Sequence, residues 1–438
     1  MNSTLADLKS ALAAGQADQG LTRLYGKAAL AEQRARYRQL LADAEPRLEG
    51  SSCFVASAPG RTELGGNHTD HNNGRVLASA VDLDCIAAVA PSGNDRVSLS
   101  SREYPDPLSI RLDNLSPDPA ERNSPVALIR GVGAARQQRG RAIRGFTAVI
   151  DSTCKPGTGL SSSAAFGVLV GGIFGVLEDE ALEPLQLARY GQFAENEFFG
   201  KPCGLMDQLS SAAGYTLGID FADPDNPAIT RIDTDFEDWE YRLLIIDTGG
   251  SHSDLTEEYT AVTEEIGRVT RLLQRDKARG LSVADLLGQI AALRAEAGDR
   301  ALLRVLHFIT DDLRADRQSE ALLQRDYARF LELVRQSGDS SCTQLQNCSS
   351  SKNTKEQGIL LAISLTRQLF PRAVCRVHGG GFSGTAQAYV PKDQFDDYQS
   401  LMGQVFGEGS VIPVKTGRPG FCHFTANGWL FPATGEGS

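Results

Sequence analysis

The spacing of hydrophobic and polar residues changes several times along the chain, and each change predicts a different element. Residues 1–50 are rich in Ala, Leu, Gln, Glu and Arg, and apolar residues at helical spacing within 21–24 and 30–41 predict two helices. After residue 52 the apolar runs CFVASAPG and VLASAVDLDCIAAVAP predict strands on either side of a loop rich in Gly, Asn, His and Asp. This part of the chain is therefore expected to hold a functional loop between two strands.

Further along the chain, apolar runs that predict strands alternate with Gly-rich stretches. FTAVIDS predicts a strand, and the Gly- and Ser-rich stretch Lys155–Ser163 separates it from the small-residue helix AAFGVLVGGIFGVL. Residues 183–200 and most of 254–335 have helical patterns, whereas RLLIIDTG, AVCRVHGGGF and TAQAYVP predict strands. The segment DPDNP interrupts the pattern and predicts a domain boundary within residues 220–240. Together these patterns predict an α+β chain of two domains.

Length and composition narrow the class of protein. A chain of 438 residues predicts two domains of roughly 200 residues each. The net charge of −11 argues against a nucleic-acid partner, because binding to phosphate backbones needs a basic surface. No apolar run reaches the length of about 18 residues that a membrane span needs, and we expect no signal segment. The eight cysteines form no CxxC pair, as in proteins with reduced thiols, so the sequence predicts a cytoplasmic protein.

Phosphate binding is the chemistry that the segment Pro156–Ala165 indicates. Its glycines let the main chain approach an anion, and the helix that follows offers free N–H groups at its positive end. Ser161, Ser162 and Ser163 add hydroxyls for phosphate oxygens or a magnesium ion. The Gly-Lys-Ser/Thr ending of a Walker A loop is absent, and a plain Ser/Gly loop with an N-cap serine is the alternative.

Sugar binding is the chemistry that the loop of residues 60–74, GRTELGGNHTDHNNG, indicates. It gathers a cation, two carboxylates, two imidazoles and three amides, which can fix the orientation of several hydroxyls. The alternative is a solvated turn in which Asp70 and Asn72 bond to their own main chain. His68 and His71 have a spacing that could suggest a metal, but neither a helical context nor a third ligand supports one.

Two further segments carry candidate residues. Glu195–Gln208 contains Asp207 after an apolar pair, where an aspartate is often only a helix cap. His378–Gly384 is a glycine-rich segment after a predicted strand, and a simple turn is its alternative.

Taken together and in this order, the four segments resemble the galactokinases of the GHMP kinase superfamily. The galactokinase motif GRxNLIGEHTDYNGG is similar to GRTELGGNHTDHNNG, and PxGxGLSSSAA is similar to residues 156–165. CGIMDQ appears as CGLMDQ, GGGFGG appears as Gly379–Gly384, and Leu345–Asn347 also fits. The resemblance spans about residues 52–390.

The resemblance implies a two-domain GHMP kinase fold of the α+β class. A ribosomal-protein-like α+β domain is expected over residues 1–225, with a helical extension at 1–50, and an α/β domain over 226–438. The active site would lie in the cleft between them. The expected partners are galactose or a similar monosaccharide and Mg·ATP, with no nucleic acid and no membrane, and the chain is expected to be a monomer.

The activity that the resemblance implies is ATP-dependent phosphorylation of the anomeric (C1) hydroxyl of galactose, which gives galactose 1-phosphate. Asp207 would orient that hydroxyl or accept its proton, while Arg61 would keep Asp207 ionised and stabilise the transferred phosphoryl group. The residues expected to contact the sugar are Arg61, Asn67, His68, Asp70, Gly204, Asp207 and Tyr259. Those expected to wrap the ATP phosphates are Pro156, Gly157, Thr158, Gly159, Leu160, Ser161, Ser162 and Ser163. Those expected to bind Mg²⁺ are Ser162, Ser163 and Glu195.

Three departures from the galactokinase pattern concern the identity of the sugar. Asn67 stands where the pattern has Glu, His71 where it has Tyr, and residues 63–65 read Glu-Leu-Gly instead of Asn-Leu-Ile. A neutral amide at position 67 would tolerate a C6 carboxylate that a glutamate would repel. Galacturonate or another galacto-configured sugar is therefore an alternative substrate, and a non-catalytic, galactokinase-like sugar sensor is an alternative function.

Overall fold

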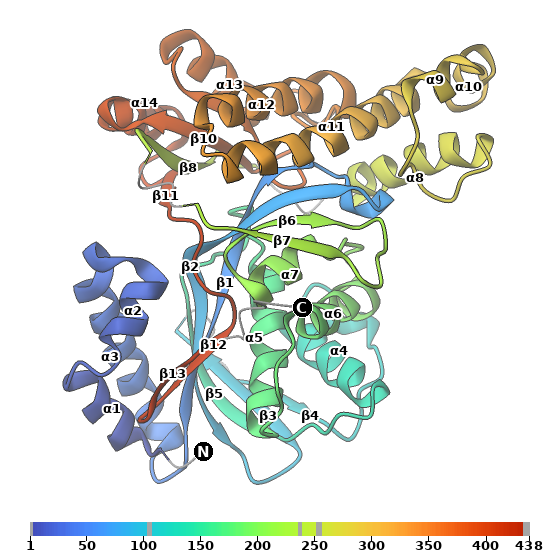
Figure 1. Cartoon of the computed structure of the whole chain (residues 1–438). Helices are drawn as coiled ribbons and strands as arrows, with labels where there is room; N and C mark the ends of the chain where they lie inside the picture. The colour runs from blue at the N-terminus through green and yellow to red at the C-terminus, as the bar shows by residue number, and fades with distance from the viewer. Residues whose placement is uncertain (1–2, 103–106, 235–238, 251–255, 432–438) are drawn as a thin grey trace.

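The computed structural model shows a chain built around two β-sheets, each with its own helices (Figure 1). It describes residues 3–102, 107–234, 239–250 and 256–431. The larger sheet has nine strands and the smaller sheet has four. The mixed helices and sheets confirm the predicted α+β class.

The larger sheet is antiparallel except for one parallel pair, β3 with β5. Its strands, in spatial order, are β13 (Gly428–Leu430), β12 (Cys422–Thr425), β1 (Phe54–Gly65), β2 (Arg75–Pro91), β5 (Phe146–Ser152), β3 (Arg96–Ser101) and β4 (Leu108–Arg111). Beside this path, β6 (Thr216–Asp220) pairs with the first part of β2, and β7 (Ala228–Ile232) pairs with β6. The first and longest strands of this sheet, β1 and β2, thus border the loop expected to bind sugar.

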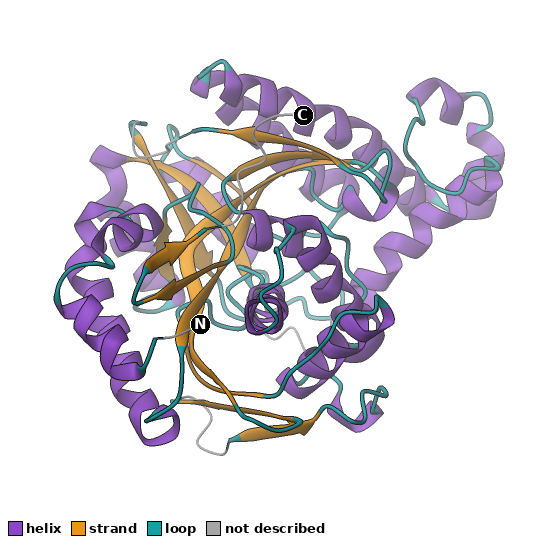
Figure 2. Ribbon diagram, turned by 60° about the horizontal axis from the view of Figure 1, so that its bottom comes forward, coloured by secondary structure: helices purple, strands orange, loops and turns teal. Residues whose placement is uncertain are grey.

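Helices cover both faces of the larger sheet (Figures 1 and 2). One layer is made of α1 (Leu5–Ala13), α2 (Asp18–Tyr25) and α3 (Leu30–Leu48), and the other of α4 (Pro125–Gln138), α5 (Ser162–Leu177), α6 (Pro184–Phe193) and α7 (Met206–Ala213). On β1, Val55 packs with the first layer, whereas Phe54 and Ala56 pack with the second. Because each face is buried, the strand reads as a continuous apolar run instead of an alternating one.

The smaller sheet is antiparallel and lies in the second half of the chain. Its strands, in spatial order, are β11 (Val411–Val414), β8 (Tyr241–Asp247), β10 (Thr385–Pro391) and β9 (Val374–Val377). The helices of this half are α8 (Thr256–Leu272), α9 (Val283–Leu287), α10 (Ile290–Ala297), α11 (Asp299–Leu323), α12 (Tyr327–Ser340), α13 (Gly358–Leu369) and α14 (Phe395–Phe406). Leu64 and Leu77 from the larger sheet share a buried cluster with Leu243 and Ile245 of β8, so the two sheets are joined by a common apolar core.

Strands that follow residue 226 join the larger sheet. They are β7, β12 and β13, while the division into domains at 225/226 stays a prediction. Cys422 and Phe424 are buried against the N-terminal helices, and this contact holds β12 there. The N-terminal extension has three α-helices instead of two, since Thr4 and Asp7 form a capping box that starts α1.

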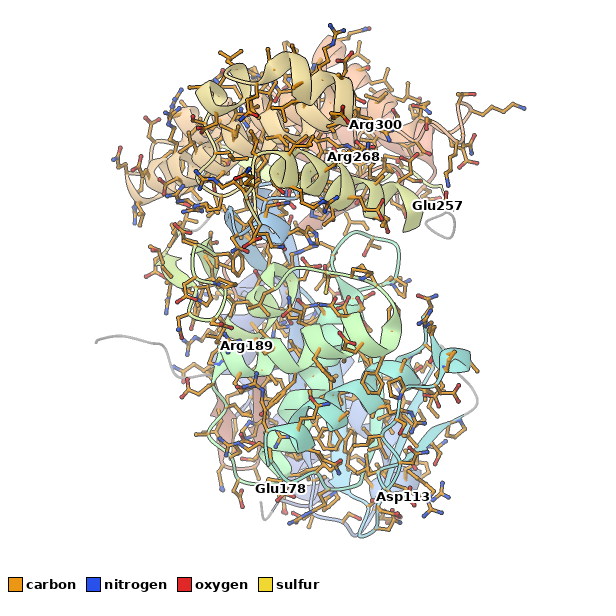
Figure 3. All side chains as sticks on the ribbon, turned by 90° about the vertical axis from the view of Figure 1, so that its right-hand side faces the viewer. Asp113, Glu178, Arg189, Glu257, Arg268 and Arg300 are labelled. Carbon is orange, nitrogen blue, oxygen red and sulfur yellow. The ribbon has the colours of Figure 1, made fainter. Side chains whose placement is uncertain are left out.

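Figure 3 labels six charged side chains, among them Glu178, Arg189 and Arg300. These three are 21%, 24% and 46% exposed. Among the described residues, no helix combines the length and the apolar character that crossing a membrane would need.

Candidate active site

The segment expected to bind phosphate lies between β5 and α5. Gly157 and Gly159 have φ angles of 85° and 70°, which favour glycine. Ser161 is the N-cap residue of α5, yet its φ of 56° is left-handed and its side chain makes no cap hydrogen bond. Its hydroxyl donates instead to Oδ2 of Asp207. The first N–H groups of α5 therefore lack a serine cap, which suits them to bind an anion.

Asp207 and Arg61 form an ion pair beside this segment. Nε of Arg61 donates to Oδ1 of Asp207 at 2.7 Å, and another guanidinium nitrogen donates to the carbonyl oxygen of Gly159 at 2.7 Å. Burial alone would raise the pKa of Asp207, but Arg61, Lys201 and the hydrogen bond from Ser161 lower it to about 2. Asp207 lies in the first turn of α7 and its side chain is 16% exposed, so it is a charged carboxylate that is partly open to solvent.

Glu195 provides a carboxylate close to the start of α5. It lies in the π-helical turn Ala194–Phe199 and is 1% exposed. Burial raises the pKa of Glu195, whereas Lys201 and hydrogen bonds from Gln208 and Ser163 oppose the rise. A hard cation would compensate this buried charge, and carboxylate and hydroxyl oxygens are the ligands that Mg²⁺ prefers. The residues present therefore fit a magnesium ion.

The loop expected to bind sugar follows β1 and packs against the start of α7. The side chain of Asp70 lies so close to Gly204 that a Cβ at Gly204 would come within 1.8 Å of Oδ2 of Asp70. The rings of His68 and His71 are stacked with centroids 6.0 Å apart. No group of three or more His, Cys, Asp or Glu side chains in the described ranges is arranged to hold a metal.

The glycine turn, residues Gly379–Gly381, lies against this loop. Nε2–H of His68 donates to the carbonyl oxygen of Gly380 at 2.9 Å, and the hydroxyl of Tyr259 donates to that of Gly381 at 3.1 Å. A Cβ at Gly380 would come within 2.5 Å of the Tyr259 ring, so the close approach requires glycine. Burial, followed by the charge of His71, lowers the pKa of His68 to about 3, so its ring is neutral at physiological pH.

Asn67 differs from the other residues expected to contact sugar. It is 0% exposed, and its amide makes hydrogen bonds to Glu63, Gly379, Ser341 and Asn347. The structure thus brings together the other residues expected to contact the sugar, which are Arg61, His68, Asp70, Gly204, Asp207 and Tyr259. The side chain of Asn67 instead forms hydrogen bonds with other protein groups.

Several residues near the site were not identified from the sequence. Lys201 places its ammonium 3.7 Å from Oε2 of Glu195, and its charge acts on both Asp207 and Tyr259. His378 is buried and lies 3.0 Å from the Thr62 hydroxyl through Nε2. Lys201 lies within the segment Glu195–Gln208, so its positive charge could have identified it from the sequence as a candidate site residue. For His378, the glycines that follow it were the available indication.

Comparisons with known proteins match both halves of this site. The galactokinase galactose-binding signature matches residues 47–91, and the GHMP kinases N-terminal domain matches residues 127–215. The first range includes the residues expected to bind sugar from Arg61 to Asp70, and the second includes those expected at the phosphates together with Glu195 and Asp207. Tyr259 lies outside both ranges.

Solved structures with this fold include several small-molecule kinases. The galactokinase of Lactococcus lactis complexed with galactose has a TM-score of 0.76 at 22% identity, covering 88% of this chain and 99% of that one. The mevalonate kinase of Methanococcus jannaschii has a TM-score of 0.59 at 14% identity, covering 83% and 98%. A D-glycero-D-manno-heptose 1-phosphate kinase from Bacteroides thetaiotaomicron has a TM-score of 0.58 at 13% identity, covering 85% and 98%.

These findings confirm the resemblance to galactokinase and the GHMP kinase fold. They support a galactokinase-like sugar kinase, and GHMP kinases use ATP as the phosphate donor.

Proposed function

We propose that this chain is a galactokinase that transfers the γ-phosphoryl group of ATP to the C1 hydroxyl of galactose and yields galactose 1-phosphate. The observation that carries the proposal is that Asp207 contacts both Arg61 of the sugar motif and Ser161 of the phosphate segment. One carboxylate thereby joins the two halves of a phosphoryl-transfer site. The galactose-binding signature supports galactose as the acceptor.

Asp207 is proposed to hold the acceptor hydroxyl. With a pKa of about 2 it is ionised at neutral pH, so it accepts a hydrogen bond well but is a weak base. Phosphoryl transfer through a loose transition state depends more on an oriented hydroxyl than on early removal of its proton. We therefore assign to Asp207 the orientation of the C1 hydroxyl and the receipt of its proton late in the transfer.

Arg61 and the start of α5 are proposed to stabilise negative charge. The guanidinium of Arg61, fixed by Asp207 and Gly159, suits the charge that develops on the transferred group. The N–H groups of residues 157–163 would hold the phosphates. Ser162, Ser163 and Glu195 would hold Mg²⁺, whose positive charge neutralises the β- and γ-phosphate oxygens.

His68, Asp70, Gly204 and Tyr259 are proposed to bind the sugar hydroxyls. Asp70 and His68 offer an acceptor and an imidazole, and Gly204 leaves room for Asp70. Lys201 is paired with Glu195 at 3.7 Å and its charge acts on Asp207, which is proposed to hold the C1 hydroxyl. It therefore gives no ground for choosing between galactose and galacturonate at C6.

The test is a kinase assay with Mg·ATP and galactose, galacturonate, glucose, arabinose or N-acetylgalactosamine, with NMR identification of the phosphorylated carbon. Asp207→Ala is the blank, and Asp225→Ala, at an exposed carboxylate, is the matched control. Turnover of galactose to the 1-phosphate, lost only in the blank, supports the proposal. Turnover of galacturonate alone would make galacturonate the substrate in place of galactose. Binding of ATP and sugar without turnover would overturn the proposed enzymatic activity and favour a sugar sensor.

A further inference from the structure

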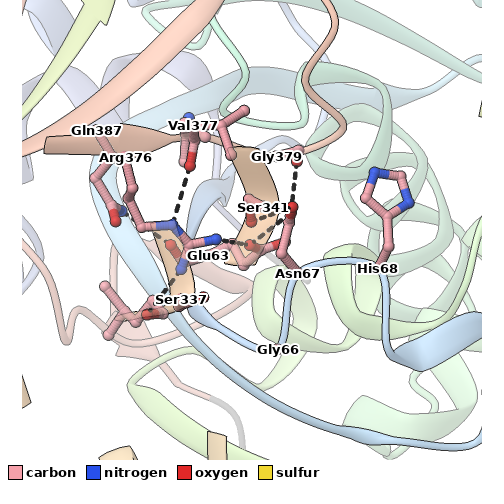
Figure 4. Close-up of polar contacts among 12 residues, drawn as sticks. Glu63, Gly66, Asn67, His68, Ser337, Ser341, Arg376, Val377, Gly379 and Gln387 are labelled. Carbon is pink, nitrogen blue, oxygen red and sulfur yellow. Dashed lines mark hydrogen bonds and ion pairs between the residues drawn. The ribbon is translucent and has the colours of Figure 1, made fainter. Parts of the chain in front are cut away.

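A buried network, which we call the Glu63 network, lies where the two sheets meet (Figure 4). It is built around an ion pair between Glu63 on β1 and Arg376 on β9, with a nitrogen–oxygen distance of 2.6 Å. The side chains of Glu63 and Arg376 are 3% and 0% exposed. Arg376 also donates to the carbonyl oxygen of Leu64 at 3.3 Å. The pair therefore links the strand that carries Arg61 to the strand that leads into the glycine turn.

Asn67 is the second member of the Glu63 network, and its amide is saturated. Nδ2 donates to Oε1 of Glu63 at 2.9 Å and to the carbonyl oxygen of Gly379 at 2.8 Å. Oδ1 accepts from Nδ2 of Asn347 at 2.8 Å and from the hydroxyl of Ser341 at 3.2 Å. A side-chain amide has two donor hydrogens and two acceptor lone pairs, so all four positions are used.

The main chain of Asn67 is held equally firmly. Its N–H donates to Oδ2 of Asp311 at 2.9 Å, and its carbonyl oxygen lies 2.9 Å from Nε2 of His307. The next residue, His68, reaches the carbonyl oxygen of Gly380. A shift of Asn67 would therefore move the His68 ring and the glycine turn together.

We propose that Asn67 is a positioning residue that locks the sugar loop onto the glycine turn, with Glu63 as its required partner, and is not a ligand of the sugar. The inference rests on the proposed sugar kinase activity. It deepens that proposal, because it assigns the recognition of the sugar to the neighbours of Asn67 and not to its amide.

The charge arrangement explains why an amide stands at position 67. Oε1 of Glu63 accepts from Arg376 and from Asn67 at the same time. A glutamate at position 67 would set two carboxylates against each other in a buried site, where they cannot both ionise. In the galactokinase pattern the amide stands at the first of these positions and the carboxylate at the second. Here the two are exchanged, which keeps one carboxylate in the network.

The experiment is a double-mutant cycle made of Asn67→Glu, Glu63→Asn and the double exchange. Each single variant is expected to lower kcat/KM for the preferred sugar, and also the folding equilibrium constant, by more than about 100-fold. The double exchange restores one carboxylate and one amide, so both quantities should return to within about tenfold of the parent protein. The ratio of kcat/KM for galactose to that for galacturonate should stay within about threefold throughout.

Two results would overturn the proposal. One is additive losses, in which the double exchange is no better than the product of the singles. The other is an Asn67→Glu variant that folds normally and changes the galactose to galacturonate ratio by about 100-fold, as loss of a direct sugar contact would. Asn226→Glu, which makes the same chemical change in an exposed loop, is the control and should leave both quantities unchanged.

A milder cycle covers the case in which a single variant does not fold. Glu63→Gln removes the carboxylate and Asn67→Asp adds one, each with little change in the size of the side chain. In the double variant, kcat/KM and the folding equilibrium constant should again recover relative to the single variants. Coupling between residues 63 and 67 in unfolding does not depend on catalysis. A parent protein without sugar turnover would therefore overturn the proposed function, whereas absence of coupling would overturn the positioning role.

Discussion

Asp84 and Asp207 are two aspartates whose pKa is lowered to about 2, but Asp84 is buried and Asp207 is half-buried. Asp84 on β2 is 0% exposed. Its Oδ2 accepts from Tyr25 at 2.6 Å, Ser57 at 2.6 Å and Arg418 at 2.7 Å, and its Oδ1 accepts from Arg36 at 2.7 Å. Burial opposes its ionisation, but the two arginines lower the pKa of Asp84 to about 2. This carboxylate is enclosed by protein donors.

Asp207 has an arginine, a serine and the same pKa of about 2, yet its side chain is 16% exposed. A depressed pKa therefore does not distinguish a functional carboxylate from a structural one, since ion-pair networks produce the same shift. Access distinguishes them. Asp84 ties α2 and α3 to the larger sheet and to the segment before β12, whereas Asp207 can accept a hydrogen bond from a ligand.

The largest effect is expected for Asp207→Asn. We expect kcat to fall by about 10²–10⁴-fold, because the amide cannot receive the proton of the acceptor hydroxyl and aligns it poorly. The free energy of unfolding should fall by about 1–3 kcal/mol, since the amide has one acceptor oxygen where the carboxylate has two and leaves the buried Arg61 without its counter-charge. Steady-state kinetics and denaturant unfolding measure the two quantities. Retained turnover would show that Asp207 has no part in the transfer.

Asp84→Asn should lower the stability more than Asp207→Asn does, and it should leave kcat nearly unchanged. Removing the carboxylate leaves Arg418 buried without a counter-charge, so we expect the free energy of unfolding to fall by about 3–5 kcal/mol. Denaturant unfolding measures this loss. The kcat per folded molecule should stay within about threefold of the parent value, because Asp84 lies on the side of the sheet away from α5 and α7. A loss of kcat without a loss of stability would contradict the comparison.

Acid should reveal the contribution of Asp84 directly. Its folded pKa of about 2 is depressed below the ordinary value of 3.8. The stabilisation is therefore fully present above about pH 4 and is lost as the pH falls towards 2. Between these values the parent protein should lose about 2 kcal/mol of its stability advantage over Asp84→Asn. Unfolding curves of both proteins from pH 5 to pH 2 test this, and a constant difference would contradict it.

The sequence predicted the elements with strong local patterns and missed contacts that only the fold creates. FTAVIDS and TAQAYVP correspond to β5 and β10 in full, since a buried apolar run followed by glycines or charges has clear ends. The short strands β12 and β13 were not predicted, because β12 is buried, and Trp429 of β13 partly buried, against helices about 400 residues away in the chain.

The candidate site shows the same division. Arg61 and Asp207 were identified because each lies in a recognisable motif, and the fold brings them into contact across 146 positions of sequence. Arg376 lies in an ordinary strand pattern, so nothing local indicates that it neutralises Glu63, 313 positions away. For the same reason the sequence suggested Asn67 as a sugar contact, while the structure shows its amide bonded to residues from three other segments.

The smallest effects come from a matched pair of serines, Ser57 and Ser161, each of which donates to one of the two aspartates. Ser57→Ala removes a fully buried donor, so the free energy of unfolding should fall by about 1–2 kcal/mol while kcat is unchanged. Ser161→Ala removes a donor from Asp207, which should raise the pKa of that carboxyl and lower kcat by about tenfold or less. The two variants delete the same atom from the same kind of pair. A loss of stability in one and of rate in the other would show that access to the carboxylate, and not its ionisation, separates Asp84 from Asp207, the proposed catalytic carboxylate. Equal changes in both measurements would remove that distinction.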